Sequence, residues 1–155
     1  MSLRETLQRA KETGDLNLLI DAVPYARFLG LSARVFGDEV ITEMRFSQKL
    51  IGNPVLPALH GGTVGALLES AAIFKLLWDG ETVRVPKTIN ITVSYLRSPK
   101  PVDTFAQPII TRQGRRVANV RIEAWQQERQ RPVAVAHAHF LLVPEPGTPK
   151  AEPSG

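Results

Sequence analysis

The sequence predicts an α+β fold in which one antiparallel sheet curls round a single long helix. The helix is indicated by a proline-free run that begins at Gly61 and continues to about Trp78, with apolar residues on nearly every side. The sheet is indicated by the strict alternation of apolar and polar residues that follows Arg84. Because one curled sheet buries such a helix economically, the two patterns together predict this architecture.

Length and composition limit the class of protein. A chain of 155 residues is long enough for one domain with a sizeable core, and its 43% hydrophobic and 22% charged residues are ordinary for a soluble globular protein. Cys is absent, which excludes disulfides, thiol nucleophiles and cysteine metal sites. Neither an apolar run of roughly 18 residues nor an apolar signal segment is present, so we expect a cytoplasmic protein.

Residues 1–30 are predicted to form a short helical extension. Ser2 and Glu5 have the spacing of a capping box, and Gly14 ends the helix that they open. A second short helix follows, and then a segment over residues 24–30 with two aromatic side chains. We expect these side chains to pack on the layer beneath; they are Tyr25 and Phe28.

The remaining elements are predicted to be strands. Two strands joined by a hairpin precede the long helix, and a proline-containing loop leads into it. The alternation places Thr88 on one face of the next strand and Ile91 on the other. Pro108 predicts an edge or a bulge. The expected strands cover residues 31–36, 40–46, 88–95, 104–111, 117–125 and 132–143. One domain over residues 1–143 therefore precedes a tail, 144–155, predicted to be disordered.

Glu69 is the only ionisable residue between Gly61 and Phe74 on the long helix. A carboxylate on an apolar, buried helix is costly unless it is paired or functional. One interpretation is a salt bridge to an arginine of this basic chain, and the other is a catalytic group. The sequence pattern leaves both open.

The stretch His60-Gly61-Gly62, with Glu69 nine residues after the His, resembles the start of the central helix in hotdog-fold acyl-CoA thioesterases. It is most similar to the PaaI-like and 4-hydroxybenzoyl-CoA thioesterase branch, in its Glu-type form. The resemblance covers residues 25–143, and its other elements are Phe28-Leu29-Gly30-Leu31, Asn53, Tyr95-Leu96-Arg97 and Gly114-Arg115-Arg116. It implies a hotdog fold and the hydrolysis of an acyl- or aryl-CoA thioester to a free acid and CoA.

The chemistry of thioester hydrolysis accounts for these residue types. Amides at a helix N-terminus lack intrahelical partners, so those of Gly61 and Gly62 suit a developing oxyanion. Glycine also lets a substrate carbonyl approach the backbone closely. Glu69 is then a general base that activates water, or a nucleophile that forms an anhydride.

His60 and Asn53 complete the predicted catalytic set. His60 is either a catalytic group or a residue that positions the loop and the helix start by hydrogen bonding. Asn53 either orients water or the thioester carbonyl, as the resemblance implies, or is a turn residue before Pro54. The loop is one residue longer than the commonest family spacing. Ile73 stands where some Glu-type relatives carry a supporting hydroxyl, a role left to Ser70 or to water.

Other catalytic arrangements lack a matching pattern. A Ser–His triad has no Gly-x-Ser-x-Gly elbow to support it. His137 and His139 share one strand face, but a third metal ligand of convincing spacing is missing. We therefore predict no metal and no separate cofactor, because coenzyme A enters as part of the substrate.

Basic residues concentrate after Arg84 in a chain of formal net charge +4. No helix-turn-helix, zinc or RNP pattern accompanies them, so neither nucleic acid nor a membrane is an expected partner. Arg97, Arg115 and Arg116 match strand-end positions at which the resemblance implies contacts with the CoA phosphates; the other interpretation of each is a solvated surface residue.

Two other functions stay open. One is an acyl-thioester hydratase or dehydratase, whose His and acid are set farther apart in sequence than His60 and Glu69. The other is a non-catalytic acyl-CoA-binding module. The acyl group also stays open between aryl and medium aliphatic chains.

Gly61 and Glu69 do not easily serve one carbonyl within a single chain. Eight helical rises separate them by about 12 Å along the axis. A second copy running antiparallel across a two-fold axis brings its Glu69 beside the first chain's Gly61. We therefore expect a homodimer with shared active sites, assembled as a dimer of dimers, and the resemblance implies the same sharing.

Overall fold

The computed structural model describes residues 1–144 of the chain. Its helices are α1 (Leu3–Thr13), α2 (Asn17–Asp21), α3 (Pro24–Leu29) and α4 (Gly61–Asp79), with a short 3-10 helix at Gln48–Leu50. Its strands are β1 (Leu31–Phe36), β2 (Glu39–Met44), β3 (Ile51–Asn53), β4 (Ala58–Leu59), β5 (Arg84–Tyr95), β6 (Thr104–Gln113), β7 (Val117–Trp125) and β8 (Ala134–Pro144). No helix among these residues is long and apolar enough to cross a membrane.

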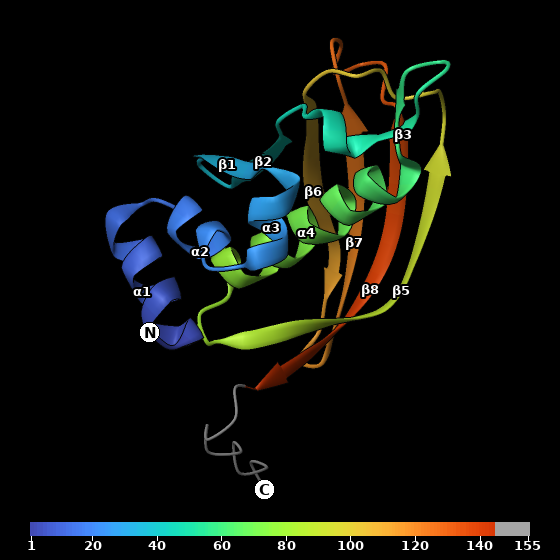
Figure 1. Cartoon of the computed structure of the whole chain (residues 1–155). Helices are drawn as coiled ribbons and strands as arrows, with labels where there is room; N and C mark the ends of the chain where they lie inside the picture. Colours follow the sequence, from blue (N-terminus) through green and yellow to red (C-terminus); the bar gives the residue numbers. More distant parts are fainter. Residues whose placement is uncertain (145–155) are drawn as a thin grey trace, which may run out of the picture.

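Six of the strands form one antiparallel sheet in the order β1-β2-β6-β7-β8-β5. The sheet curves, and α4 lies along its concave face (Figure 1). The predicted α+β architecture, one antiparallel sheet round one long helix, is therefore confirmed. The strand order places β5 at one edge of the sheet, paired only with β8.

The core lies between α4 and the inner face of the sheet. The face of α4 toward the sheet is apolar and fully buried, and its residues include Val64, Leu67, Leu68, Ala71 and Ala72. The inner face of the sheet carries many small buried side chains, among them Ala106, Ala118, Ala124, Ala134, Ala136 and Ala138. Small residues let the helix approach the sheet closely, as dense interior packing requires.

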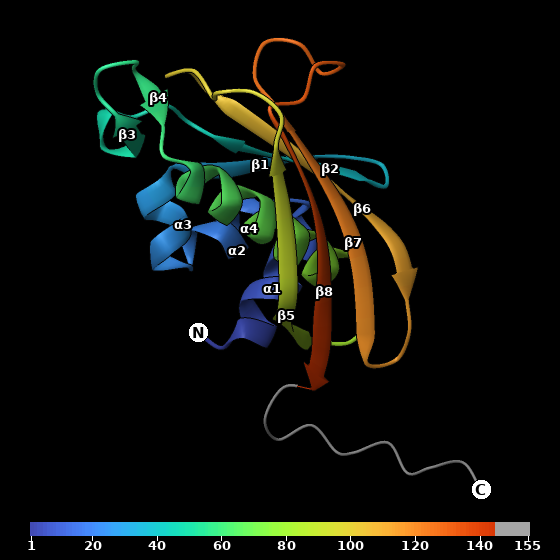
Figure 2. The ribbon, with the colours of Figure 1, turned by 90° about the vertical axis from the view of Figure 1, so that its right-hand side faces the viewer.

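The N-terminal helices cover α4 on the side away from β6, β7 and β8 (Figure 2). The predicted capping box is present: Ser2 Oγ accepts from the amide of Glu5 at 3.2 Å, and Glu5 Oε2 accepts from the amide of Ser2 at 3.0 Å. Gly14 ends α1 with a φ of 70°, a left-handed conformation that glycine adopts without strain.

The expectation that the aromatic residues of α3 pack inward is wrong. Tyr25 and Phe28 are 55% and 48% exposed, and they stack on each other with ring centroids 5.9 Å apart. The inward face of this short helix carries Ala26 and Leu29 instead. The helical period explains the outcome, because residues 25 and 28 share one face and residues 26 and 29 share another.

The alternation predicted for β5 is also interrupted. Thr88 pairs with Phe140 and Asn90 pairs with His139, so Ile89 forms a bulge without a partner on β8. Ile89 is 55% exposed, although the uninterrupted pattern placed it on the buried face. Residues before the bulge therefore change faces relative to those after it.

Smaller differences concern the loop and the ends of strands. The loop before α4 contains a two-stranded sheet, β3–β4, which the sequence pattern did not predict. Pro108 lies where β6 continues beyond its pairing with β2, which ends at Ala106, so the predicted edge position is confirmed. Pro144 belongs to β8, opposite Arg84, rather than to the predicted tail. The rest of that tail, 145–155, lies outside the described residues.

Candidate active site

His60 is the N-cap of α4 and fixes the start of the helix. Its Nδ1 atom accepts a hydrogen bond of 2.8 Å from the amide of Gly62, and its carbonyl accepts one of 2.7 Å from Thr63 Oγ1. A Cβ on Gly62 would lie 2.8 Å from His60 Nδ1, so this cap requires glycine. His60 therefore forms the hydrogen bond expected of a residue that positions the helix start. The Gly62 amide is used in this hydrogen bond.

The segments before α4 fix the backbone at His60. The amide of His60 donates to the carbonyl of Leu50, in the 3-10 helix, at 2.8 Å, and the amide of Leu59 in β4 donates to the carbonyl of Pro99 at 3.0 Å. A Cβ on Gly52 would lie 2.6 Å from the Cα of His60, so the β3 backbone lies directly against the cap. Glycine at position 52 is therefore required by the close approach to His60, a contact that the sequence pattern did not predict.

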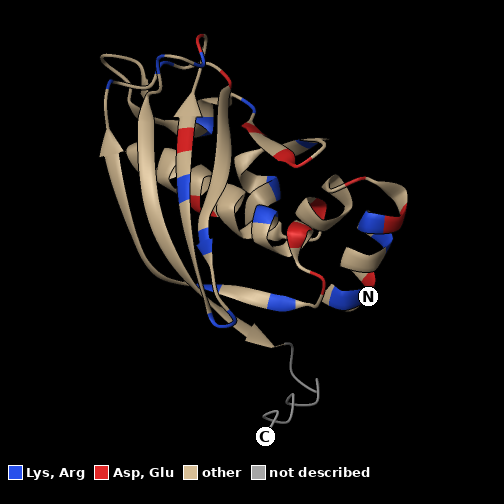
Figure 3. Cartoon of the chain, turned by 180° about the vertical axis from the view of Figure 1, so that it is seen from behind, with Lys and Arg blue, Asp and Glu red and all other residues tan. Residues whose placement is uncertain are grey.

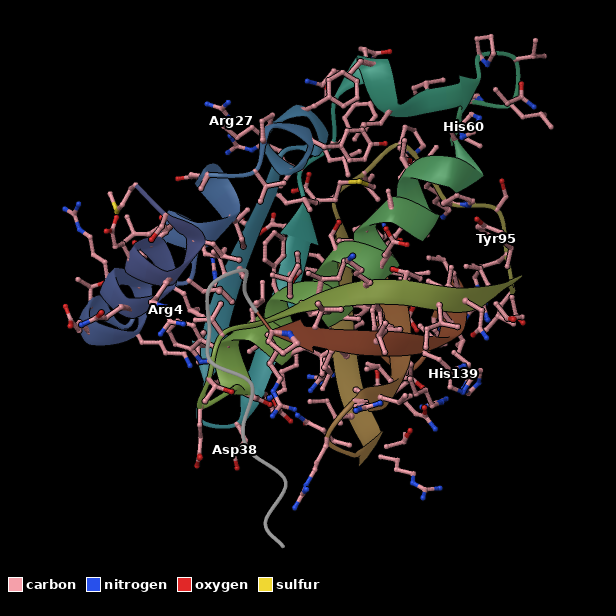
Figure 4. All side chains as sticks on the ribbon, turned by 90° about the horizontal axis from the view of Figure 1, so that it is seen from below. Arg4, Arg27, Asp38, His60, Tyr95 and His139 are labelled. Atoms are coloured by element: carbon pink, nitrogen blue, oxygen red, sulfur yellow. The ribbon has the colours of Figure 1, made fainter. Side chains whose placement is uncertain are left out.

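Tyr95, at the end of β5, lies over the first turn of α4. Its hydroxyl donates a hydrogen bond of 2.7 Å to the carbonyl of Gly61. Cβ atoms added to Gly61 and Gly65 would lie 3.4 and 3.5 Å from Tyr95. Figure 4 shows His60 and Tyr95 at the same end of α4. Tyr95 therefore occupies part of the space that the glycines leave open beside the start of α4. The sequence pattern did not predict this contact.

The Gly61 amide has no partner within residues 1–144. It occupies the first helical position, where the amide lacks an intrahelical acceptor. Because the Gly62 amide is already bonded to His60, the amide of Gly61 is the donor that this end of α4 leaves open to a ligand.

Glu69 lies two turns further along α4 and is half-buried. Its Oε2 atom accepts a hydrogen bond of 3.2 Å from Thr88 Oγ1 of β5. In the part of the chain that the structure describes, no lysine or arginine forms an ion pair with Glu69. The salt-bridge interpretation of this carboxylate therefore finds no support. Thr88 is a site residue that the sequence pattern assigned to the wrong face.

Lys75 provides a contrast on the same helix. This buried cation forms an ion pair with Asp79 at 2.9 Å and donates to the carbonyl of Asp38. Lys75 thus has a carboxylate partner on its own helix, whereas Glu69 has no cationic partner within residues 1–144. The hydroxyl of Thr88 is therefore the side-chain partner that the described residues give to Glu69.

Asn53 forms a turn at the tip of the β3–β4 sheet. Its Oδ1 atom accepts hydrogen bonds from the amides of Val55 at 3.0 Å and Leu56 at 3.3 Å, in the manner of an Asx turn. The side-chain oxygen is therefore occupied in a structural role. A role for Asn53 in orienting water stays a prediction.

The three arginines predicted to contact CoA do not lie together in one chain. Arg97 follows β5 at the Tyr95 end and donates from Nε to the carbonyl of Pro132 at 3.1 Å. Arg115 and Arg116 form the β6–β7 hairpin, where Arg84 donates to the carbonyl of Arg115. The pairing of β5 with β8 places these two groups at opposite ends of the sheet, both of which carry basic segments (Figure 3).

Arg97 borders a cavity of about 150 Å³ at the end of the sheet where β5 ends and β8 begins. Lys100 and Arg131 line the same cavity, with Glu128 as its one carboxylate among the lining residues. Neither cation forms an ion pair within residues 1–144. This arrangement suits an anion such as a phosphate.

His139 lies on the face of the sheet away from α4 (Figure 4). Its Nδ1 atom lies 2.6 Å from Asn90 Oδ1, and His137 is exposed on the same face. Among the described residues, no three His, Cys, Asp or Glu side chains gather in a way that could hold a metal ion.

Comparison with known proteins identifies the family. Residues 53–142 match the model of the acyl-CoA thioesterase N-terminal domain. A Chromobacterium violaceum protein of known crystal structure is 40% identical, with a TM-score of 0.74 over 90% of this chain and 97% of that one. No curated protein sequence matches significantly.

Two more distant structures share the fold. A phenylacetic acid degradation-related protein from Ralstonia eutropha is 24% identical, with a TM-score of 0.71 over 82% of this chain and 98% of its own. A thioesterase from Haemophilus influenzae is 20% identical, with a TM-score of 0.72 over 83% and 90% of the two chains. Because the matched domain spans more than half of the sequence, the chain belongs to the acyl-CoA thioesterase domain family of the hotdog-fold thioesterase superfamily.

Proposed function

We propose that this protein hydrolyses an acyl- or aryl-CoA thioester to a free acid and CoA, as in the PaaI-like, Glu-type branch of its superfamily. The observation that carries the proposal is the half-buried Glu69 carboxylate, which has a hydroxyl partner and no cation within residues 1–144. The open amide of Gly61 on the same helix supplies a donor for an oxyanion.

The proposed reaction begins with the thioester carbonyl oxygen at the Gly61 amide. Glu69 takes a proton from water as the water oxygen attacks the carbonyl carbon, and the Gly61 amide stabilises the resulting oxyanion. The tetrahedral intermediate then collapses, the C–S bond breaks, and the proton passes to the leaving sulfur. In the alternative, Glu69 attacks the carbonyl carbon, the C–S bond breaks, and the CoA thiolate leaves and takes a proton from solvent. Water then hydrolyses the resulting anhydride and frees Glu69.

We further propose that two copies share each site. The support is the position of β5 at the edge of the sheet, with Ile89 half-exposed there and one side of the strand unpaired. Antiparallel pairing of β5 with its copy reverses α4 as well, so Gly61 of one copy approaches the Glu69 of the other. Assembly into a dimer of dimers and a cytoplasmic location stay predictions.

The same pairing supports a location for the CoA phosphates. Arg97, Lys100 and Arg131 line a cavity at the end of the sheet where Tyr95 contacts Gly61. Arg115 and Arg116 lie at the opposite end of the sheet in the same chain. In an antiparallel dimer, the arginines of one copy approach the cavity of the other. We therefore assign the phosphate contacts to Arg97 of one copy, with the hairpin arginines of the other.

A panel of aryl- and acyl-CoA substrates tests the proposed function, with free thiol and enoyl absorbance followed together. We expect thiol release from the wild type without an enoyl signal. Glu69→Gln should reduce turnover by at least about a hundredfold while CoA binding persists. Glu39→Gln, an exposed change on β2, serves as the matched control.

The competing outcomes are distinct. An enoyl signal without thiol release would indicate a hydratase or dehydratase, and binding without any turnover would indicate a binding module. Turnover of Glu69→Gln within about tenfold of wild type would overturn the assignment of Glu69.

A further inference from the structure

Thr88 provides the hydroxyl that α4 itself does not supply to Glu69. Its Oγ1 atom lies 3.2 Å from Glu69 Oε2, and both side chains are half-buried. A carboxylate only accepts hydrogen bonds, so Thr88 is the donor. We propose that Thr88 is a positioning residue that holds Glu69 in its reactive orientation, an inference that rests on the proposed thioester hydrolysis.

The bulge at Ile89 is what directs Thr88 toward α4. In a regular strand, residues 88 and 91 lie on opposite faces. Here both face inward, because Ile89 has no partner on β8 and the pairing resumes at Asn90. Bulges of this kind reorient a side chain at a site. Removing the bulge would turn Thr88 away from Glu69 while Ile91 stayed in the core.

The contact constrains the torsion that matters for catalysis. The terminal torsion of a glutamate side chain is broad, so a carboxylate held only by its own helix samples many orientations. Ile73, one turn after Glu69, is apolar and offers no donor. Thr88 is β-branched and stiff at χ1, and it fixes Oε2 from outside the helix. Oε1 is then left to accept the proton of water or to attack the carbonyl.

A residue with this role acts on turnover rather than on substrate binding. Thr88 bonds to the base and is not assigned any contact with the CoA portion of the substrate. Its loss should therefore lower kcat and leave KM nearly unchanged. Its effect should also depend on the hydroxyl and not on the methyl group, because valine has nearly the same shape.

The experiment compares Thr88→Val, Thr88→Ser and Thr92→Val in the full chain, with kcat and KM measured on the best thioester of the panel. Thr92 is the matched control, since it lies on the same strand with its side chain exposed. We expect Thr88→Val to lower kcat by about ten- to hundredfold, the rate equivalent of one hydrogen bond to a charged group. The kcat of Thr88→Ser should stay within about threefold of the wild-type value, and the kcat of Thr92→Val should equal the wild-type value.

Three kinetic results would overturn the proposal. They are a Thr88→Val enzyme within about twofold of wild type, a serine variant as slow as the valine variant, and a loss confined to KM. In each case the wild type remains an active thioesterase, so the proposed function stands.

A second measurement tests the contact without catalysis. The midpoint of thermal unfolding is compared for Thr88→Val in the wild-type background and in Glu69→Ala. A shift that shrinks in the Glu69→Ala background shows coupling between the two side chains, and equal shifts in both backgrounds refute the contact. If the wild type hydrolyses no thioester, the proposed function and the catalytic role of Thr88 both fail, whatever the coupling.

Discussion

The Nδ1 atom of His60 accepts a hydrogen bond of 2.8 Å from the amide of Gly62, so the second amide of α4 is already occupied. The first amide, that of Gly61, has no partner within residues 1–144. A ligand oxyanion at this end of α4 therefore meets one open backbone donor. The proposed chemistry depends on that single N–H group.

Gly61→Pro removes this donor and keeps the helix start. Proline is well accepted at the first helical position, and the extended conformation of His60 is one that a residue before proline adopts. We expect kcat to fall by about a hundred- to thousandfold, as for other lost oxyanion donors. Gly61→Ala is the control: it keeps the N–H, and its Cβ makes the same 3.4 Å approach to Tyr95. Equal activities of the two variants would refute the donor role.

The cap itself is tested through His60. His60→Ala removes the acceptor for the Gly62 amide and should destabilise the protein by about 1 kcal/mol, whereas His60→Asn keeps a good N-cap and should retain most of the stability. Unfolding in urea measures both. If His60→Asn is stable and fully active, His60 is a positioning residue. A stable His60→Asn protein with greatly reduced kcat would instead give the imidazole a chemical role.

The sequence was sufficient to predict the long helix and the strands because their signals are local. The capping box at Ser2, the glycine at position 14 and the apolar run from Gly61 each act within a few residues. Glu69 was recognisable as an isolated carboxylate for the same reason. Whether Glu69 has a counterion depends on the packing of distant segments, which no local sequence pattern predicts.

The features that sequence reasoning missed arise from pairing between distant segments. The bulge at Ile89 leaves the apolar alternation of β5 intact in the sequence, and only the register with β8 reveals it. The sequence pattern therefore places Thr88 on the outer face. The contact of Tyr95 with Gly61 spans 34 residues, and it exists because β5 ends beside the start of α4. The separation of Arg97 from Arg115 likewise follows from strand order.

The two groups of arginines are expected to bind the same part of the substrate, the CoA phosphates. Arg97→Ala removes a cation from the cavity at the Tyr95 end of the sheet, and the double change of Arg115 and Arg116 to Ala alters the β6–β7 hairpin. Both should raise KM for CoA thioesters by about tenfold and leave N-acetylcysteamine thioesters, which lack the phosphates, unaffected. Arg9→Ala, on the exposed face of α1, controls for the loss of charge. Equal losses on both substrate types would assign the arginines a structural role.

Thr42 offers a prediction about stability alone. This residue is fully buried in β2, and its Oγ1 atom has no hydrogen-bond partner within residues 1–144. Thr42→Val removes an unsatisfied polar group at nearly constant shape, so it should stabilise the protein by about 1 kcal/mol. Thr104→Val is the control variant, because Thr104 is equally buried but its Oγ1 atom accepts a hydrogen bond of 3.2 Å from Gln126. It should lower the midpoint of thermal unfolding, and a rise in both variants would contradict the reasoning.

The shared site is tested by mixing two inactive parents, Gly61→Pro and Glu69→Gln. If each site combines Gly61 of one copy with Glu69 of the other, a mixed dimer carries both lesions in one site and leaves its second site whole. Random pairing after co-refolding makes about half of the dimers mixed, so the mixture should recover about a quarter of wild-type activity. If both residues of a site came from one chain, every site would carry a lesion and no activity would return. The fraction of mixed dimers is measured independently, with a mass tag on one parent. Proven mixed dimers without recovered activity would place the whole site within one chain, and α4 alone would then have to bridge the about 12 Å between its two functional groups.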